Sequence, residues 1–502
     1  MKSPTNKNLF ILPSILALAT LLRLAGIFSR PIWYDEAFAL LFSSKGPAEM
    51  LYGTLTATSG GASDIHPLGY YTLLWLWMKV FGQSLVATRG LSILAGMATI
   101  VFAYRLAAEL FDEKTAQTAA ILIGLSPFHI HYSQEIRMYA FLAFWLALST
   151  YAFIRGKRSR KIKWWIIFSV SAAMAQYTHN LAAFYLLPLA ASPLIWRDWK
   201  SLLYAILAGL GALLFYIPWL TQLPSQVEKI ANAYWVERPG AEKFITLLLV
   251  YVTNLPLPNT ALLFLGLFLA LTVIAIGLMQ TFHRGNEKRD GIWLLYLAFM
   301  PPVLLFLFSQ WLPVYIERAL LPSGVFFCIW LSWVLVKTNL PRPIQISVAV
   351  CLLAASGMGV FQHLTYRGFP YGQFSLLNST IEHKLEDGDL IIHSSKLSYL
   401  PAFYFNPSLP QGFILDPPKS NVDTLAPATR KILRVREFDT IEEAADKAER
   451  IWFVIYKPSI EEYTLQGHTT HPHLTYLDEN FQLESVEELD DLKLYLYKRT
   501  TP

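Results

Sequence analysis

An acidic pair, Asp35 and Glu36, follows directly after the first apolar segment of the chain. An arginine and several aromatic residues flank the pair in the run Arg30-Pro-Ile-Trp-Tyr-Asp-Glu-Ala-Phe38. Charged side chains are costly beside a membrane core, and they are usually retained there for function. We therefore interpret the pair as the centre of an active site, in which Asp35 is the expected general base.

Four further polar motifs combine carboxylate, imidazole, guanidinium and phenol groups. They are Asp64-Ile-His-Pro67, His129-Ile-His-Tyr-Ser-Gln-Glu-Ile-Arg-Met-Tyr139, Tyr177-Thr-His-Asn180 and Tyr315-Ile-Glu-Arg318. A guanidinium can hold two phosphate oxygens at once, so Arg137 and Arg318 are expected to bind a phosphate, assisted by His66 and His179. Glu36 and Glu135 would orient an acceptor, raise the pKa of Asp35 or supply oxygen ligands to a cation.

Each of these residues also has a purely structural interpretation. Glu135 and Arg137 could form an ion pair at a helix end, and Arg318 could extend its charge toward the membrane surface. His66 could be an ordinary turn residue, and His179 a polar cap. Four tyrosines are candidate substrate contacts: Tyr34, Tyr132, Tyr139 and Tyr177. The alternative for Tyr132, Tyr139 and Tyr177, and for Tyr315 as well, is the aromatic belt of a membrane protein.

The composition identifies the class of protein that must position these groups. Of 502 residues, 54% are hydrophobic and only 15% are charged, and the mean hydropathy is +0.38. Soluble domains carry about 25% charged residues, so the chain is expected to cross a membrane many times. The net charge of +5 is too small to suggest a nucleic-acid partner. Two cysteines in apolar segments, Cys328 and Cys351, do not indicate a disulfide framework.

The distribution of cations predicts the orientation. The loop from Arg155 to Lys163 holds six cations and no acid, so it is expected in the cytoplasm, as is the loop 283–289. If Lys2 and Lys7 are also inside, an even number of crossings must separate the end of the first helix from the outer surface near His129. One apparent span must therefore be excluded, and we interpret the short aromatic segment 67–82 as an interfacial helix on the outer face. Segment 244–253 is expected to be a second interfacial helix. About eleven crossings then remain, at 9–28, 88–108, 115–130, 138–154, 164–178, 181–196, 201–221, 260–281, 292–310, 319–336 and 344–361. This arrangement brings all five polar motifs to the outer face.

The composition changes after about residue 361, where acids, Asn and Pro become frequent. Strand-like stretches at 389–393, 451–456 and 492–497 and a helix-like stretch at 440–450 predict a small α/β domain. We therefore divide the chain into a membrane domain at 1–361 and an extracytoplasmic domain at 362–502. The second part has no glycine-rich phosphate loop and no metal-ligand spacing, which favours a structural or acceptor-related role over catalysis.

In these motifs the chain resembles the GT-C superfamily of glycosyltransferases that use polyprenyl-phosphate sugars, in particular its protein-mannosyltransferase-like and aminoarabinose-transferase-like bacterial members. The resemblance rests on the acidic pair, on His66-Pro-Leu-Gly-Tyr-Tyr71 with Phe81-Gly82 and Arg89 after it, and on Tyr132-Ser-Gln-Glu-Ile-Arg-Met-Tyr139. Bacterial relatives often have Pro-Pro after the histidine, where this chain has Pro67-Leu68.

The resemblance implies a mainly helical GT-C membrane fold and an enzyme that transfers a hexose or pentose from a polyprenyl-phosphate donor to an envelope acceptor. The acceptor would be a glycolipid, a polysaccharide or a protein. Transfer would occur in one displacement with inversion at the anomeric carbon. No cofactor is expected with certainty, and a divalent cation held by Glu36, Glu135, His66 or His179 is left open.

A transporter or lipid flippase is the main alternative. Transporters often show inverted repeats and charged, broken helices near the midplane, whereas here the charges cluster in outer loops and no internal repeat is visible. A scaffold protein is a third interpretation. A bacterial plasma membrane is expected as the location, because the chain stops at Thr500-Thr-Pro502 without a retention signal.

Overall fold

The computed structural model describes residues 10–58, 61–62, 64–232, 234–252, 260–283, 287–417, 425–446 and 448–500. The chain forms two compact units. The first comprises Met1–Phe28, Ile65–Ala231 and Val236–Thr365, and the second comprises Ser29–Asp64, Asn232–Trp235 and Tyr366–Pro502. The division proposed after residue 361 stays a prediction. Lys2 and Lys7, which entered the topology argument, lie outside the described residues.

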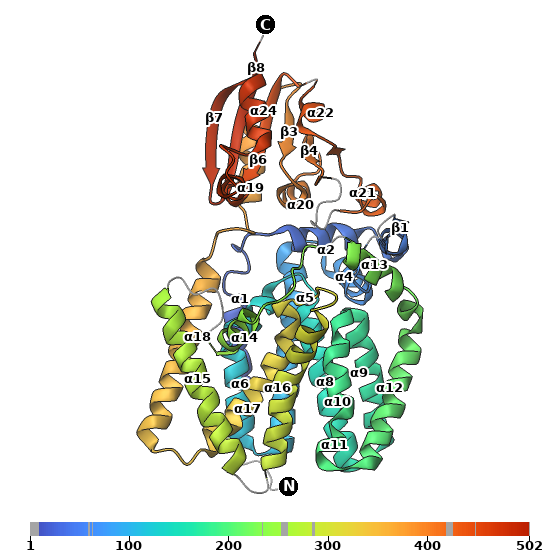
Figure 1. Ribbon diagram of the computed structural model, residues 1–502, viewed down its shortest axis with the longest axis vertical. Coiled ribbons are helices and arrows are strands. Elements are labelled where there is room, and N and C mark those ends of the chain that lie inside the picture. The colour runs from blue at the N-terminus through green and yellow to red at the C-terminus, as the bar shows by residue number, and fades with distance from the viewer. Residues whose placement is uncertain are drawn as a thin grey trace. The chain divides into compact units, whose positions relative to one another are not determined.

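The first unit is helical, and its long helices run side by side in Figure 1. Its elements are α1 (Ile11–Leu24), α4 (Gly69–Phe81), α5 (Leu85–Leu110), α6 (Glu113–Leu125), α7 (Pro127–Gln134), α8 (Tyr139–Ser159), α9 (Ile162–Thr178), η2 (Asn180–Ala182), α10 (Ala183–Ala191), α11 (Pro193–Trp196), α12 (Trp199–Leu220), α13 (Leu223–Asn232), α14 (Glu242–Val252), α15 (Thr260–His283), α16 (Lys288–Phe308), η3 (Glu317–Leu320), α17 (Leu321–Lys337) and α18 (Arg342–Thr365).

Every predicted membrane span corresponds to helical structure, and the predicted interfacial segments correspond to α4 and α14. Within the described residues, seven helices are long and apolar enough to cross a bilayer, and two apolar helices are shorter. The protein is therefore a multi-pass membrane protein. The count of eleven crossings stays a prediction.

The segment expected as one span at 115–130 is instead two helices, α6 and α7. The backbone of Ser126 is extended between them, because the proline that follows, Pro127, disfavours a helical conformation there. The Ser126 hydroxyl then accepts a hydrogen bond from the backbone N–H of His129 at 3.3 Å and caps α7. This short capped helix leads directly into the predicted site residues.

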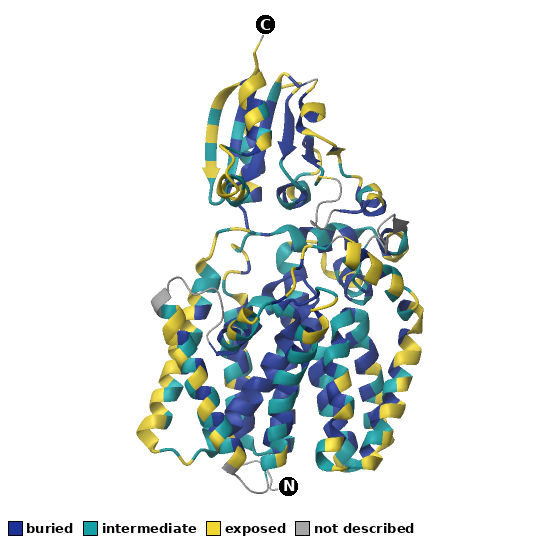
Figure 2. Ribbon diagram, viewed as in Figure 1, coloured by how far each residue is buried: buried dark blue, intermediate teal, exposed yellow. Residues whose placement is uncertain are grey.

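Burial separates an inner group of helices from an outer one, as Figure 2 shows. In α8 and α17, 72% and 78% of the apolar span is buried, whereas the shares for α15 and α18 are 22% and 11%. The outer helices expose large apolar side chains such as Phe264, Phe268 and Phe361. Such surfaces suit contact with lipid tails, and they leave α8 and α17 as the interior scaffold for polar groups.

The second unit is built on a six-stranded mixed sheet with helices around it, which confirms the predicted small α/β domain. Its strands run in the order β5-β4-β3-β6-β8-β7, with β3 to β6 parallel and β7 and β8 antiparallel. Its elements are α2 (Tyr34–Ser44), α3 (Pro47–Leu55), β1 (Ala57–Thr58), β2 (Gly61–Ala62), α19 (Phe374–Lys384), β3 (Leu390–His393), α20 (Lys396–Phe405), β4 (Gln411–Ile414), α21 (Pro427–Leu433), β5 (Glu437–Phe438), α22 (Ile441–Ala445), β6 (Arg450–Tyr456), α23 (Lys457–Leu465), α24 (Pro472–Asn480), β7 (Phe481–Leu489) and β8 (Leu492–Arg499).

The predicted strands appear within one or two residues of their expected positions, but the expected helix at 440–450 is much shorter. Thr440 caps α22 by accepting from the Glu443 N–H at 3.3 Å, and the helix ends at Ala445. β6 begins at Arg450, and its side chains Ile451, Phe453 and Ile455 lie in the hydrophobic core of the sheet. Burial of these three side chains therefore overrides the helical propensity of the preceding acidic stretch.

Candidate functional site

The break between α7 and α8 carries two of the predicted site residues. α7 ends before Glu135, whose backbone is extended, and α8 begins at Tyr139. Glu135 is 1% exposed and Arg137 is 3% exposed. A carboxylate and a guanidinium are thus buried on non-helical backbone, at a point where the inner helices of the first unit meet. Buried charges of this kind require partners or a ligand.

Glu135 has a histidine partner on the preceding helix, α7. The Nε2 atom of His131 lies 2.9 Å from the Oε1 atom of Glu135. The His131 ring also lies 4.5 Å from the His363 ring, and the Nε2 atom of His363 is 2.7 Å from the Oε1 atom of Gln134. These contacts join α7 to the last turns of α18 and hold the Glu135 carboxylate in place.

The predicted pair of histidines from two distant loops lies together. The rings of His66 and His179 are 5.6 Å apart and meet edge to face. Close packing of α4 on the end of α9 explains the meeting, because a Cβ atom on Gly69 would lie 2.6 Å from the Tyr177 carbonyl oxygen. Asn180 adds a tether by donating from Nδ2 to the Ile65 carbonyl at 2.9 Å.

His179 presents a buried hydrogen-bond donor. Its Nδ1 atom accepts from the Leu181 backbone N–H at 3.2 Å, which leaves the proton of the neutral ring on Nε2. Burial lowers the pKa of His179 well below its usual value, and the nearby His66, Arg137 and Arg318 lower that pKa further. Within the described residues, Nε2 has no hydrogen-bond partner. A phosphate or hydroxyl oxygen would satisfy it.

The remaining predicted residues of the first unit surround this donor. The Arg318 guanidinium lies 5.3 Å from the centre of the Tyr139 ring, which itself lies 5.9 Å from the ring of His179. Tyr132 packs on Tyr139 at 5.4 Å, and Arg137 donates from Nη1 to the Tyr71 hydroxyl at 3.3 Å. The structure thus brings seven predicted residues into one part of the first unit, which we call the buried polar cluster: His66, Tyr132, Glu135, Arg137, Tyr139, His179 and Arg318. Its buried members are Glu135, Arg137, Tyr139 and His179, and the other three are partly exposed.

Tyr177 lies beside this cluster with its hydroxyl group directed elsewhere. The hydroxyl donates to the Phe215 carbonyl at 2.8 Å, and the ring packs on Tyr216 at 5.0 Å. These contacts brace α9 against α12. A substrate-binding role for Tyr177 stays a prediction.

Asp35, Glu36 and Tyr34 belong to the second unit, where they form the first turn of α2. Trp33 caps this helix with an extended backbone, and the positive end of the helix dipole favours both carboxylates. Glu36 is fully buried, Asp35 is partly exposed, and Tyr34 stacks on Phe38 at 6.3 Å. The two carboxylates therefore have different surroundings, and Asp35 is the more accessible of the two.

Two buried polar residues on α13 were not predicted from the sequence. Gln226 is 1% exposed and accepts from the Asn180 Nδ2 at 3.1 Å, and Lys229 is 8% exposed one turn further along the helix. A polar pair spaced three apart in an amphipathic helix was the available signal. Lys229 is thus a buried cation on the helix that contacts Asn180.

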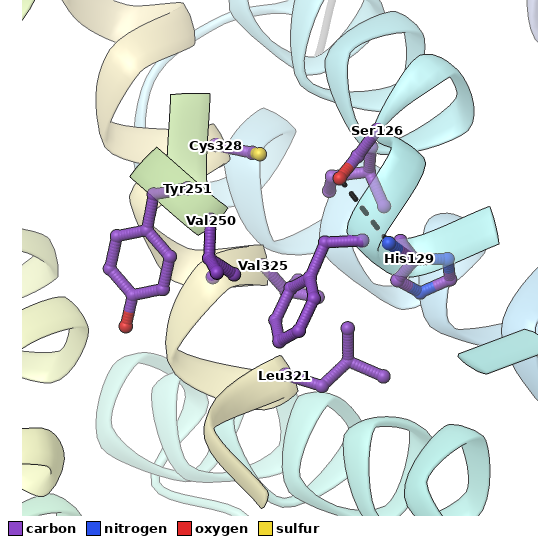
Figure 3. A pocket seen from close by; sticks show the side chains of 10 residues that line it. Ser126, His129, Val250, Tyr251, Leu321, Val325 and Cys328 are labelled. Atoms are coloured by element: carbon purple, nitrogen blue, oxygen red, sulfur yellow. Dashed lines mark hydrogen bonds between the residues drawn. The ribbon is translucent and has the colours of Figure 1, made fainter. Parts of the chain in front are cut away.

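The first unit contains two small cavities beside the helices that carry the predicted site residues. Figure 3 shows the first, which Ser126, His129, Tyr251, Val325 and Cys328 help to line behind α7. It is largely apolar, and none of the predicted site residues lines it. The second is lined by apolar residues of α8, α16 and α17, together with residues just after His179 and Arg318 in the chain: Leu181, Phe184, Tyr185, Ala319 and Leu320.

A comparison with protein families matches residues 65–221 to a family described as dolichyl-phosphate-mannose-protein mannosyltransferase. An undecaprenyl phosphate-alpha-4-amino-4-deoxy-L-arabinose arabinosyl transferase from Pseudomonas aeruginosa is 32% identical over 161 residues. That match covers 30% of this chain and only 29% of the relative's length. Its Pseudomonas paraeruginosa counterpart is 31% identical over the same length.

Solved structures match over nearly the whole chain. ArnT from Cupriavidus metallidurans in the apo state has a TM-score of 0.64 and 13% identity, covering 96% of this chain and 97% of its own. The protein has the GT-C fold. The mainly helical membrane fold that the resemblance implied is therefore confirmed.

Other structures with the GT-C fold match less closely. ArnT bound to undecaprenyl phosphate has a TM-score of 0.61 and 12% identity, covering 96% of this chain and 97% of its own. The oligosaccharyltransferase AglB from Archaeoglobus fulgidus, in complex with an inhibitory peptide and a dolichol-phosphate, has a TM-score of 0.52 and 10% identity. That match covers 98% of this chain and 74% of AglB.

The divalent cation left open by the sequence has no matching ligand set. Among the residues that the structure describes, no three His, Cys, Asp or Glu side chains are grouped so as to hold a metal ion.

Proposed function

We propose that the protein is a membrane glycosyltransferase that moves a sugar from a polyprenyl-phosphate donor to an envelope acceptor. The buried polar cluster of the first unit carries the proposal. Arg137 and His179 are buried, Arg318 is partly exposed, and the Nε2–H of His179 has no hydrogen-bond partner among the described residues. Such donors stabilise a phosphate that gains charge as its bond to a sugar breaks.

The apolar residues next to His179 and Arg318 in the chain are consistent with a lipid-linked donor. The residues that follow His179 and Arg318 in the chain line an apolar space. A ligand with a phosphate at one end and an isoprenoid chain at the other matches this arrangement, in which His179 and Arg318 are followed by apolar residues. The matching relative is described as acting with undecaprenyl phosphate, and one structural neighbour contains that lipid.

Each predicted site side chain has one role in the proposed reaction. Asp35 takes the proton from an acceptor hydroxyl, and the resulting oxygen attacks the anomeric carbon. The bond from that carbon to the phosphate oxygen breaks, and the lipid phosphate leaves with both bonding electrons. Arg137, Arg318 and His179 hold its oxygens, while His66 and Glu135 orient the site. A single displacement of this kind inverts the configuration of the sugar. Tyr34, Tyr132, Tyr139 and Tyr177 are the proposed sugar contacts.

A binding experiment tests the phosphate assignment. We expect undecaprenyl phosphate to raise the thermal unfolding temperature of the purified protein more than undecaprenol of equal length does, because only the former offers a charged ligand to Arg318. Arg318→Ala should remove most of the difference, and Arg342→Ala, at an exposed arginine of α18, should leave it unchanged. Equal effects of the two lipids on wild-type protein would contradict the assignment.

We also propose a plasma-membrane location with the active site and the C-terminal domain on the outer side. The six-cation loop is the supporting observation. A reporter enzyme fused near Ser159 should be active in the cytoplasm, and one fused near Gln466 should be active outside. A cytoplasmic result at Gln466 would reverse the orientation and remove the base from the outer face.

A further inference from the structure

The second unit has a topological switch point, and part of its own chain lies there. β4 and β5 continue the sheet on one side of β3, whereas β6 lies on the other side. In parallel sheets, ligands bind at the carboxyl ends of the strands beside such a point. α20 begins directly after β3 at this edge, and α2 packs against α20. The helix that begins with Asp35 and Glu36 thus lies against the part of the sheet where a ligand would be expected.

A short connecting segment, residues 366–374, is fastened to the same edge. We call it the strap. The backbone N–H of Phe369 donates to the Oδ2 atom of Asp491 at 2.8 Å, in the turn between β7 and β8. The hydroxyl of Tyr456, the last residue of β6, donates to the Pro370 carbonyl at 3.0 Å. Two strands of the sheet therefore fix the path of the strap.

The strap in turn holds the residues that precede α2. Arg367 donates from Nη1 to the Ser29 carbonyl at 2.8 Å, and Arg30 donates from Nη2 to the Tyr371 hydroxyl at 2.5 Å. The Arg30 guanidinium also lies 5.0 Å from the centre of the Tyr371 ring. Trp33, the residue that caps α2, meets the same ring edge to face at 6.2 Å. Tyr371 thus contacts two residues, Arg30 and Trp33, that come directly before α2.

The segment that follows α2 is held as well. α3 packs on α21, and a Cβ atom on Gly53 would lie 2.6 Å from the Cδ1 atom of Ile432. The Thr429 hydroxyl donates to the Gly53 carbonyl at 3.2 Å. The second unit therefore grips residues 29–55 at both ends, and α2 has little freedom to turn or slide relative to the sheet.

We infer that Tyr371 is a positioning residue for the base: through the strap, the C-terminal sheet sets the direction of the Asp35 carboxylate. This inference rests on the proposed function, because it assigns the α/β domain a role in that same reaction. A misplacement of about 1 Å can cost about 100-fold in rate, so a base carried on a first helical turn requires such support. The side chain itself need not touch the substrate.

Hydrogen exchange tests the mechanical part without any substrate. In Tyr371→Ala, amide exchange in peptides covering residues 29–45 should accelerate about tenfold. The acceleration should be smaller in Tyr371→Phe, because the ring contacts with Arg30 and Trp33 persist in that variant. Tyr497→Phe is the matched control. This variant also removes one hydrogen bond of a tyrosine hydroxyl, which Tyr497 in β8 donates to Asp478 at 2.7 Å. It should leave the exchange rate of the 29–45 peptides unchanged.

Kinetics test the catalytic part. With a donor that the wild-type protein uses, Tyr371→Ala should lower kcat about 10-fold to 100-fold, while the KM for the donor changes less than about twofold. A displaced base reduces the stabilisation of the transition state and leaves donor binding unchanged. Tyr371→Phe should retain more of the rate than Tyr371→Ala, and Tyr497→Phe should retain nearly all of it.

The outcomes separate this inference from the proposed function. Unchanged exchange at residues 29–45 in Tyr371→Ala contradicts the positioning role at any level of activity. Faster exchange with wild-type kcat contradicts it as well, because the movement would then not affect the base. If the wild-type protein turns over no donor, the proposed function fails, and exchange alone decides whether Tyr371 holds the segment.

Discussion

Asp35→Asn should abolish sugar transfer while leaving the fold and donor binding intact. The change removes a proton acceptor and nearly preserves the shape of the side chain, and a general base contributes about 100-fold to 10,000-fold to a rate. The amide also remains at the start of a helix, where the loss of a favourable dipole interaction costs at most about 1 kcal/mol. Steady-state kinetics of the purified variant against wild type measures the effect.

Glu49→Gln provides the matched control for that experiment. Glu49 lies in the first turn of α3, in the same unit, and it is exposed. The same exchange of a carboxylate for an amide should therefore leave kcat within about twofold of the wild-type value, because changes at exposed sites have small effects. Normal turnover by Asp35→Asn would refute the assignment of this residue as the base.

Arg137→Ala should produce the second large loss. The guanidinium is buried and close enough to His179 to affect its titration, so its removal takes one charge from the proposed phosphate site. Loss of one preorganised donor costs about 100-fold to 1,000-fold in kcat. Arg137→Lys should recover part of the rate, because an ammonium keeps the charge but not the paired geometry. The measurement is kcat and KM for the lipid-linked donor.

The control for this charge is Arg105→Ala, at an exposed residue of α5 in the same unit. It should retain nearly full activity. If Arg137→Ala folds and keeps wild-type kcat/KM, Arg137 does not hold the donor phosphate, and Glu135 with Arg137 is better explained as a structural element of the α7–α8 break.

The membrane helices could be predicted from the sequence because apolar runs of sufficient length have few other stable conformations in a bilayer. Local exceptions were harder to predict. The break at Ser126 depends on Pro127 and a serine cap within an otherwise apolar run. The short α22 reflects core packing of Ile451 and its neighbours, which no helical periodicity reveals.

The site was predictable to the extent that topology brings loops to one face. His66 and His179, more than a hundred positions apart in the chain, were expected to share a surface, and their rings do meet. Their immediate partners were not predictable. The contact of Gln134 with His363 and the tether from Asn180 to Ile65 depend on how distant helices pack, and residue types alone do not encode that packing.

The link between Arg30 and Tyr371 joins residues 341 positions apart. Arg30 precedes the acidic pair, Tyr371 belongs to no predicted motif, and the sequence suggested a domain boundary between them. The structure groups residues 29–64 with the C-terminal sheet, while the boundary after residue 361 stays a prediction. A polar loop after a first membrane helix therefore does not reveal from its own sequence which unit will hold it.

Release of free polyprenyl phosphate is the most direct test of the central claim. Wild-type protein and Asp35→Asn would be incubated with radiolabelled polyprenyl-phosphate sugars, including 4-amino-4-deoxy-L-arabinose and mannose, together with crude envelope acceptors. We expect wild-type protein alone to release the lipid phosphate from one donor and to transfer its label to an acceptor. Equal release by both proteins, or movement of an intact labelled lipid across the membrane with no release by either, would contradict the account.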